Sequence, residues 1–208
     1  MNIAVFASGR GSNFQAILNA IQHQLLPARV CVLISNNSAA GALDLARAHR
    51  IPAMHLSQRQ FSDEKVFIDE LLSALQKHDT GLIALAGYMK KLPPRVVQQF
   101  RNRILNIHPA LLPAFGGPGM YGMHVHRAVL NSGATTTGAT VHLVDEEYDG
   151  GPIVMQKTIS IERGDTPERL AERVLAIEHE IYPLALKAFA EGRVKIEGLK
   201  VKILEPGA

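Results

Sequence analysis

Two side chains that could take part in chemistry stand at the end of an apolar run near the middle of the chain. Asn106 and His108 lie two positions apart within residues 105–113, and Pro109 follows them directly. Residues two apart on an extended backbone project to the same side, and proline ends a hydrogen-bonded strand. The sequence therefore predicts a strand end that presents an amide and an imidazole together. A purely structural pair is the alternative, because such side chains also satisfy nearby backbone groups.

A third polar residue, Asp149, begins the Asp-Gly-Gly sequence of residues 149–151. An aspartate in a glycine loop is commonly a turn former. Beside an imidazole, however, a carboxylate raises the imidazole pKa by favouring its charged form, so we expect Asp149 to keep His108 protonated near neutrality. Asn106 and His108 would then donate to an oxygen that becomes negative when a carbonyl carbon is attacked. The three residues together predict acyl transfer without a protein nucleophile.

A glycine-rich turn near the N-terminus is the second candidate site. Residues 8–13, Ser-Gly-Arg-Gly-Ser-Asn, connect an apolar run to residues 14–21, where apolar side chains recur at helical spacing. Free N–H groups and the positive dipole end of such a helix favour a phosphate. Ser12 and Asn13 add side-chain donors, and Ser12 is also a candidate N-cap. Phe14 replaces the third glycine of the dinucleotide fingerprint, which disfavours NAD.

Alternating strands and helices are expected to position these groups. The expected strands are residues 2–7, 29–34, 53–56 and 81–87, and the expected helices are residues 14–21, 40–49 and 62–77. This order predicts a parallel sheet with right-handed crossovers and helices on both faces. Ligands bind beyond the carboxyl ends of such strands. We therefore expect the turn at 8–13, the loop at 87–92 and the Asn106–His108 pair to face one crevice.

The second half of the chain changes character. The β-rich runs 137–144 and 152–159 are joined by a link too short for a crossover helix, so they should pair antiparallel. A helix over 167–190 with a kink at Pro183 and a small hairpin at 194–204 should follow. The sequence predicts an α/β, Rossmann-like three-layer fold with a mostly parallel sheet, an antiparallel C-terminal hairpin and a long C-terminal helix.

Composition limits the class of protein. A chain of 208 residues with 47% hydrophobic and 20% charged residues suits one globular domain. We divide it into a phosphate-binding half (1–100), a catalytic half (101–195) and a tail (196–208). The net charge of +3 is scattered, which argues against nucleic acid. The single Cys31 and the lack of a signal or membrane-spanning segment predict a cytoplasmic protein without membrane association.

Other chemistries fit the sequence less well. His124, His126 and His142 have no carboxylate or cysteine at a metal-ligand spacing, so we expect no metal. The Gly-x-Ser-x-Gly elbow of serine hydrolases is missing from the sequence. Residues 114–122 contain four glycines and predict a mobile lid instead of a packed element.

The motifs together resemble the phosphoribosylglycinamide formyltransferase family of the folate-dependent formyltransferases. The resemblance extends to about residue 195 and rests on residues 8–13, 86–89, 106–113, His142, 149–152 and the Glu-His-x-x-Tyr-Pro sequence of 178–183. The Asn-x-His-Pro and Asp-Gly-Gly motifs are shared by the wider superfamily. The Ser-Gly-x-Gly-Ser-Asn turn is more specific to this family.

The resemblance implies an activity and a set of residues. The formyl group of 10-formyltetrahydrofolate, a co-substrate, would pass to the amine of 5′-phosphoribosylglycinamide in purine nucleotide biosynthesis, without a metal. The turn would hold the ribose phosphate of the substrate, and an acidic residue would contact the same substrate. A loop and Asn106 would bind the folate. By position, the substrate residues are Gly11, Ser12, Asn13 and Glu178, and the folate-loop residues are Met89, Lys90, Lys91 and Leu92. Asn106, His108 and Asp149 match the catalytic trio, and His142 a supporting residue.

The sequence departs from the family pattern at a few positions. Lys90 stands where the family more often has arginine, so the charge is kept but the planar fork is lost. Leu175 stands where some relatives have a glutamine near the substrate, and Glu64 where some have a basic residue near the ligands. The glycine-rich segment after Pro113 is longer than in shorter members. These differences concern individual contacts and the lid.

Three alternatives remain open at this point. A formyltetrahydrofolate hydrolase uses similar residues but usually carries an extra N-terminal domain, and a transferase acting on methionyl-tRNA usually carries a C-terminal β-barrel. In a non-catalytic nucleotide-binding module, Asn106, His108 and Asp149 would be incidental. We expect small-molecule partners only, and a monomer or a homodimer.

Overall fold

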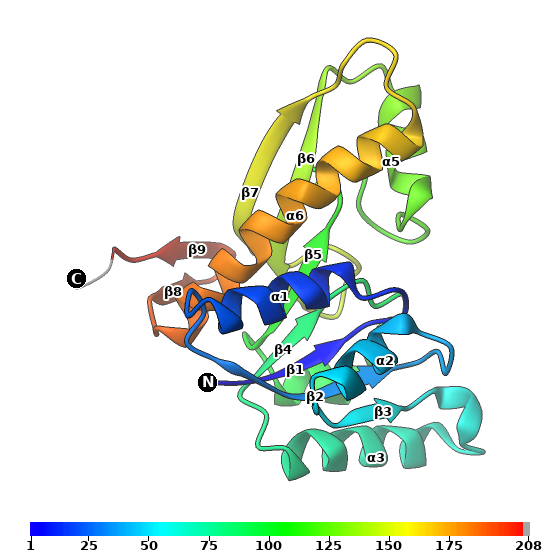
Figure 1. Cartoon of the computed structure of the whole chain (residues 1–208), viewed down its shortest axis with the longest axis vertical. Coiled ribbons are helices and arrows are strands. Elements are labelled where there is room, and N and C mark those ends of the chain that lie inside the picture. The colour runs from blue at the N-terminus through cyan, green and yellow to red at the C-terminus, as the bar shows by residue number, and fades with distance from the viewer. Residues whose placement is uncertain (206–208) are drawn as a thin grey trace. The chain divides into compact units, whose positions relative to one another are not determined.

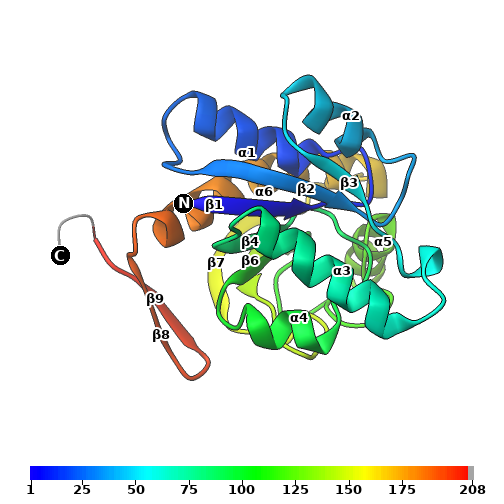
Figure 2. The same cartoon turned by 90° about the horizontal axis from the view of Figure 1, so that it is seen from below.

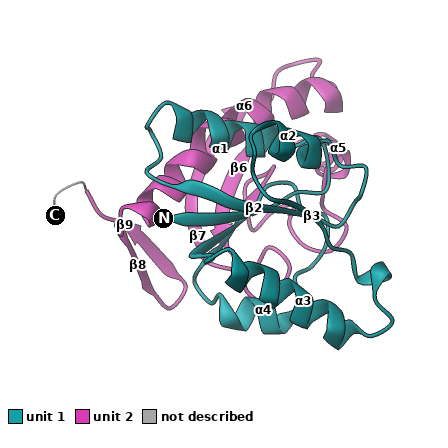
Figure 3. Ribbon diagram, turned by 60° about the horizontal axis from the view of Figure 1, so that its bottom comes forward, with its two compact units in different colours: residues 1–105 teal, residues 106–208 magenta. Residues whose placement is uncertain are grey.

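The computed structural model describes residues 1–205. The chain forms two compact units, residues 1–105 and residues 106–208, which Figure 3 distinguishes by colour. The predicted halves, 1–100 and 101–195, and their union in a single domain stay predictions. In the part of the chain that is described, no helix is long and apolar enough to cross a membrane.

The first unit alternates strands and helices as predicted. Its elements are β1 (Asn2–Phe6), α1 (Ser12–Gln22), β2 (Arg29–Ser35), α2 (Gly41–Ala48), β3 (Ala53–His55), the 3-10 helix η1 (Gln58–Gln60), α3 (Glu64–Lys77), β4 (Leu82–Leu85) and α4 (Pro94–Gln99) (Figure 1). β1 pairs in parallel with both β2 and β4, and β2 pairs in parallel with β3. Figure 2 shows α1 and α2 on one side of these strands and α3 and α4 on the other.

Burial on both faces explains why the strands of this unit are apolar throughout. The side chains of Ile3, Val5 and Phe6 are 0% exposed, as are those of Leu33 and Ile34 on the neighbouring strand. A strand covered by helices on both sides has no solvent face, so its sequence reads as a continuous hydrophobic run instead of an alternating one. The carboxyl ends of β1 and β4 are thereby fixed, and each carries a loop of the candidate site.

The second unit contains the remaining helices and strands. Its elements are β5 (Ile104–His108), which begins at the end of the first unit, α5 (Met123–Asn131), β6 (Thr136–Leu143), β7 (Ile153–Ser160), α6 (Pro167–Ala190), β8 (Val194–Glu197) and β9 (Lys200–Ile203). β6 and β7 pair antiparallel, as predicted, and α6 packs against β6 (Figure 1). Thr166 caps α6 by accepting a hydrogen bond from the backbone N–H of Arg169. The helix runs through Pro183 without interruption.

The fold class predicted from the sequence is confirmed. The seven-stranded sheet has the strand order β3-β2-β1-β4-β5-β6-β7, and β8 and β9 form a separate antiparallel hairpin. The hairpin predicted at 194–204 is therefore present, while residues 206–208 of the predicted tail lie outside the described residues. The mostly parallel sheet with helices and a long C-terminal helix is an α/β fold.

Gly138 tests the close approach of β6 to β7. A Cβ atom at this position would lie 1.9 Å from the carbonyl oxygen of Lys157 and 2.9 Å from Leu111 Cδ2. Backbone must move to admit a methyl group, so Gly138→Ala should lower the free energy of unfolding by about 2 kcal/mol. Gly9→Ala is the control, because a Cβ there meets nothing within 4 Å. Urea unfolding measures the free energy of unfolding of both variants. Equal values for Gly138→Ala and Gly9→Ala would contradict the close approach of β6 to β7.

Candidate active site

The end of β5 brings Asn106 and His108 to one side of the strand, as predicted. His108 is buried, at 3% exposure, and its Nε2 lies 2.9 Å from the carbonyl oxygen of Phe115. A carbonyl can only accept a hydrogen bond, so Nε2 of His108 carries a proton. The other ring nitrogen, Nδ1, faces Asp149 Oδ2 at 3.6 Å.

Asp149 lies between two imidazole rings. Its Oδ2 faces His108 and accepts a hydrogen bond of 3.0 Å from the backbone N–H of Gly117, while its Oδ1 lies 3.5 Å from Nε2 of His142. Burial alone would raise the pKa of Asp149, but the facing His142 and His108 rings and the Gly117 N–H together lower it. The carboxylate is therefore ionised at neutral pH, with its side chain only 13% exposed.

His142 fixes the orientation of the Asn106 amide. Nδ1 of His142 donates to the carbonyl oxygen of Leu143 at 2.8 Å, so in the neutral ring Nε2 carries a lone pair. That lone pair accepts a hydrogen bond from Nδ2 of Asn106 at 3.0 Å. Nε2 cannot accept from Asn106 and donate to Asp149 at once, and the Asn106 contact is the shorter. One amide hydrogen of Asn106 is thus held by His142.

Two glycines allow these loops to approach so closely. A Cβ at Gly116 would lie 2.6 Å from Leu112 Cδ2 and 3.2 Å from Asp149 Cβ, and one at Gly151 would lie 1.9 Å from the carbonyl oxygen of Leu143. Residues 114–122 thereby contact both His108 and Asp149, with Phe115 itself at a φ of 57°. The prediction that this segment is a mobile lid stays a prediction.

The expected charge state of His108 is wrong. Burial lowers the pKa of His108 and His142 lowers it further, whereas Asp149 and the Phe115 carbonyl raise it, and the net direction is downward. The carboxylate does favour the imidazolium, as predicted. Removal of the ring from water outweighs that attraction, so Asp149 does not hold His108 charged at neutral pH.

The turn that the sequence predicts to bind a phosphate lies at the start of α1. Gly11 is the N-cap of α1 with a φ of 89°, and a Cβ there would lie 3.0 Å from Ala42 Cβ. Ser12 is the first residue of the helix and makes no cap, so the expectation that it is the N-cap is wrong. Glycine occupies the cap because the left-handed conformation and the contact with α2 leave no room for a side chain. Asn13 follows and is buried, at 6% exposure.

Ser8 joins this turn to the loop that follows β4. Its hydroxyl accepts a hydrogen bond of 2.8 Å from the backbone N–H of Met89 and donates one of 2.5 Å to Asn36 Oδ1, while its own N–H donates to the carbonyl of Gly87. Two of the predicted site segments are therefore connected within the first unit. In the second of them, Met89 is 52% exposed and Leu92 is buried, with Lys90 and Lys91 exposed between them.

The remaining candidates lie on helices. Glu178 is buried on α6 at 7% exposure, next to the apolar residues Val174 and Ile181 of the same helix. Leu175 is half-buried on α6, and Glu64 is exposed at the start of α3. Within residues 1–205 there is no group of three or more His, Cys, Asp or Glu residues that could hold a metal ion.

Sequence reasoning missed the backbone groups that complete the site. The carbonyls of Phe115 and Leu143 determine where the protons of His108 and His142 lie. Every residue has a carbonyl, so no residue type signals this role. Ser8 belongs to the glycine-rich turn, but the contact of its hydroxyl with Asn36 joins residues 28 positions apart, and no local pattern in the sequence indicates it.

The opposing effects on His108 can be separated by titration. We expect a His108 pKa below 6.5 in the wild-type protein, because burial dominates. Asp149→Asn removes the attraction that favours the imidazolium, so it should lower this pKa further. Nuclear magnetic resonance of the ring protons across pH 4–8 measures both, with the exposed His49 as an internal control. A higher His108 pKa in Asp149→Asn than in the wild type would contradict this account.

The sequence of the chain is similar to those of proteins of known family. The family described as formyl transferase matches residues 1–186. Phosphoribosylglycinamide formyltransferase, chloroplastic, of Arabidopsis thaliana is 45% identical over 93% of this chain and 66% of that protein. Phosphoribosylglycinamide formyltransferase of Escherichia coli (strain K12) is 37% identical over 94% of this chain and 90% of that protein.

A solved structure agrees with these relatives. Glycinamide ribonucleotide transformylase 1 from Symbiobacterium toebii superposes with a TM-score of 0.92 at 41% identity, covering 99% of this chain and 94% of that one. This chain thus spans about two thirds of the length of the plant relative and nearly all of the two bacterial proteins. By its sequence and by its fold, the chain belongs to the formyl transferase family.

Proposed function

We propose that the protein transfers the formyl group of 10-formyltetrahydrofolate to the amine of 5′-phosphoribosylglycinamide, a step of purine nucleotide biosynthesis. The observation that carries the proposal is the cluster of Asn106, His108 and Asp149, with the carboxylate ionised and the amide oriented by His142. The names of the relatives, which cover almost the whole chain, support the choice of substrates. The protein acts in the cytoplasm on small molecules, without nucleic acid, membrane or metal, as a monomer or a homodimer.

The reaction is a direct attack on the formyl carbon. The amine nitrogen of the glycinamide forms a bond to that carbon, and the formyl oxygen takes up the negative charge. The free amide hydrogen of Asn106 and the Nε2–H of His108 donate to this oxygen. The bond to the folate nitrogen then breaks, and the proton lost by the amine passes to that nitrogen through water near Asp149. The products are the formylated glycinamide and tetrahydrofolate.

The state of His108 changes during the reaction. In the structure its Nε2–H donates to the Phe115 carbonyl. Residues 114–122 must therefore move this carbonyl away before the Nε2–H can donate to the formyl oxygen. A negative oxygen beside the ring favours the imidazolium, and Asp149 facing Nδ1 supports the same form. Asp149 therefore stabilises the imidazolium most once the oxyanion exists, because two negative charges together then oppose the effect of burial on the ring.

Residues of the first unit bind the two substrates. Gly11, Ser12 and Asn13 hold the ribose phosphate at the N-terminus of α1, where the backbone N–H groups and the positive end of the helix dipole favour an anion. Met89, Lys90, Lys91 and Leu92 hold the pterin of the folate, with Leu92 as a buried apolar anchor. In the second unit Glu178 contacts the glycinamide ribonucleotide, and Asn106 contacts the folate as well as the oxyanion.

Dependence on the amine separates transfer from hydrolysis. The protein is mixed with 10-formyltetrahydrofolate, with and without 5′-phosphoribosylglycinamide, and formation of tetrahydrofolate is followed by absorbance. We expect turnover only when the amine is present. Equal turnover without the amine would identify a hydrolase, and binding of the phosphorylated substrate without any turnover would identify a non-catalytic nucleotide-binding module.

Substitutions in the cluster test the assigned roles. His108→Ala removes one oxyanion donor and should lower kcat by about 10²- to 10³-fold. Asp149→Asn keeps the shape of the side chain but removes its charge, and a loss of similar size is expected. His49→Ala, an exposed histidine of the first unit, is the control. Steady-state kinetics give kcat for each variant whose circular dichroism is unchanged. A kcat near that of the wild type in His108→Ala or Asp149→Asn would refute the role assigned to the substituted residue.

A further inference from the structure

The hydroxyl of Ser8 connects the carboxyl ends of three neighbouring strands. Ser8 follows β1, Asn36 follows β2 and Met89 lies in the loop after β4, and these strands are adjacent in the order β2-β1-β4. Oγ of Ser8 donates a hydrogen bond of 2.5 Å to Oδ1 of Asn36 and accepts one of 2.8 Å from the backbone N–H of Met89. A hydroxyl donates and accepts at once, so an aliphatic side chain at position 8 would lose both contacts.

The loop after β4 is anchored on the same residue. Gly87 begins this loop with a φ of 77°, and its carbonyl oxygen accepts a hydrogen bond of 3.0 Å from the N–H of Ser8. Among the described residues, the hydrogen bonds of Gly87 and Met89 to the rest of the chain both end on Ser8. The side chains of residues 90–91 are exposed, and Leu92 is buried again. The exposed part of the loop is therefore anchored at Ser8 on one side and at Leu92 on the other.

The glycine-rich turn at the start of α1 also begins at Ser8. The carbonyl oxygen of Ser8 accepts a hydrogen bond of 3.1 Å from Nδ2 of Asn37, and the carbonyl oxygen of Gly9 accepts one of 3.1 Å from the N–H of Ala42. Gly11, the N-cap of α1, comes only three positions after Ser8. Because this connection is so short, an anion that fixes the turn at Gly11 also restricts the backbone of Ser8.

Ordering of one segment lowers the cost of ordering the other. A segment that a first ligand has already ordered loses less conformational entropy when a second ligand binds to it, so the two ligands bind cooperatively. Such coupling is reciprocal, and each ligand strengthens the other by the same factor. In the proposed function the turn at 11–13 and the loop at 89–92 bind different substrates, and Ser8 holds both segments.

We propose that Ser8 is a positioning residue that couples the two substrate sites of the first unit. A phosphate at the start of α1 fixes Ser8, and the Ser8 hydroxyl then holds the Met89 N–H and with it the loop that binds the folate. The inference rests on the proposed function and adds to it that the folate binds more tightly once the phosphorylated substrate is bound. Hydrogen bonds of this kind change an equilibrium by about three- to tenfold, which is the expected size of the coupling.

The test measures the Kd of tetrahydrofolate by calorimetry with and without saturating ribose 5-phosphate. Ribose 5-phosphate has the phosphate but no amine, and tetrahydrofolate has no formyl group, so no reaction takes place. We expect ribose 5-phosphate to lower the Kd of tetrahydrofolate about three- to tenfold in the wild type. Ribose, which has no phosphate, should leave the Kd unchanged. Binding of both ligands to the wild type without any change in Kd would overturn the coupling.

Substitutions assign the coupling to the hydroxyl. Ser8→Ala should bring the ratio of the two Kd values to within about 1.5-fold of one, whereas Ser8→Thr keeps the hydroxyl and should keep most of the ratio. Asn36→Ala removes only the group that accepts from Ser8 and should give an intermediate ratio. Ser132→Ala is the matched control, because the Ser132 hydroxyl also donates to a backbone carbonyl and accepts from a backbone N–H, but in the second unit. A wild-type ratio in Ser8→Ala would reject the role of Ser8.

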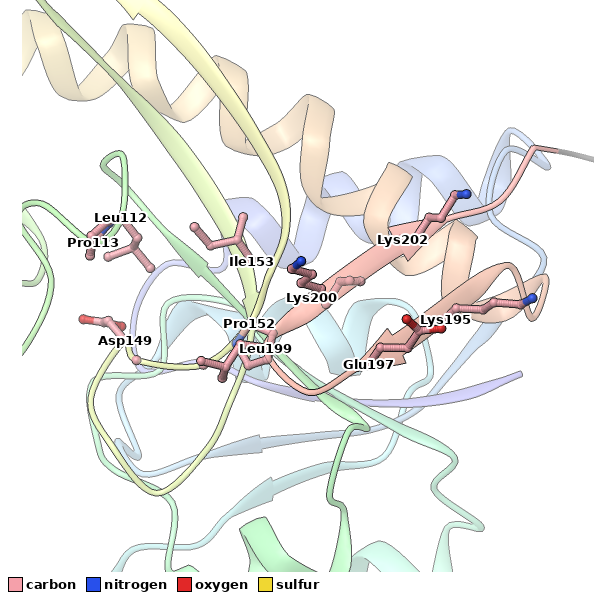
Figure 4. A pocket seen from close by; sticks show the side chains of 13 residues that line it. Leu112, Pro113, Asp149, Pro152, Ile153, Lys195, Glu197, Leu199, Lys200 and Lys202 are labelled. Atoms are coloured by element: carbon pink, nitrogen blue, oxygen red, sulfur yellow. The ribbon is translucent and has the colours of Figure 1, made fainter.

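A cavity in the second unit offers another route for such coupling. It has a volume of about 690 Å³ and lies between the loop of Asp149 and the hairpin of β8 and β9, with Asp149 and Leu199 among its lining residues (Figure 4). Coupling by this route would act through Asp149 and would not need Ser8. Leu199 is 78% exposed in the turn of the hairpin, so Leu199→Ala changes the cavity wall alone. The Kd ratio should stay at the wild-type value in Leu199→Ala, and its loss there would reject the route through Ser8.

The Met89 amide reports the coupling without any folate. Because its hydrogen is bonded to Oγ of Ser8, ribose 5-phosphate should slow its exchange with deuterium by about threefold or more in the wild type. In Ser8→Ala the exchange should not respond, and nuclear magnetic resonance measures both rates. Slowed exchange in a protein without formyl transfer would retain the coupling and reject the proposed function. Formyl transfer by a wild-type protein whose Met89 exchange ignores ribose 5-phosphate would reject the coupling alone.

Discussion

The carboxylate of Asp149, shared between two buried imidazole rings, is the interaction on which the rest of the second unit depends. An ionised carboxylate is costly to bury unless it is paired. Asp149 accepts a hydrogen bond from the N–H of Gly117 in the loop at 114–122 and lies beside the rings of His108 on β5 and His142 on β6. Three separate segments therefore meet at one charge, and two of the three neighbours are rings that can themselves gain or lose a proton.

Local patterns in the sequence predicted most of the fold. Continuous apolar runs, glycine turns and helical spacing act over a few residues, so the alternation of the first unit, the antiparallel pairing of β6 and β7 and the C-terminal hairpin could all be predicted. Element ends were less accurate, as at α3, which begins at Glu64 because Asp63 caps it. The cap of α1 was misassigned because a left-handed glycine and its contact with Ala42 are tertiary features.

The residues of the site could be predicted from the sequence, but their protonation states and tautomers could not. The spacing of Asn106 and His108 identified the pair, the Asp-Gly-Gly turn added Asp149, and the family motifs added His142. The charge of His108 could not be derived in the same way, because burial opposes the neighbouring carboxylate and burial depends on the whole fold. The tautomers depend on the carbonyls of Phe115 and Leu143, and a backbone group leaves no trace in the sequence.

Gly151 shows how far such a backbone contact can reach. Its missing side chain lets the loop fold onto the carbonyl of Leu143, the same oxygen that holds the proton on Nδ1 of His142. A methyl group at 151 would push that oxygen away, and the His142 ring could then carry its proton on Nε2. A protonated Nε2 would face the amide hydrogens of Asn106 and could no longer accept a hydrogen bond from them. The direction of the Asn106 amide therefore depends on the absence of a side chain at Gly151, through the Leu143 carbonyl and the His142 ring.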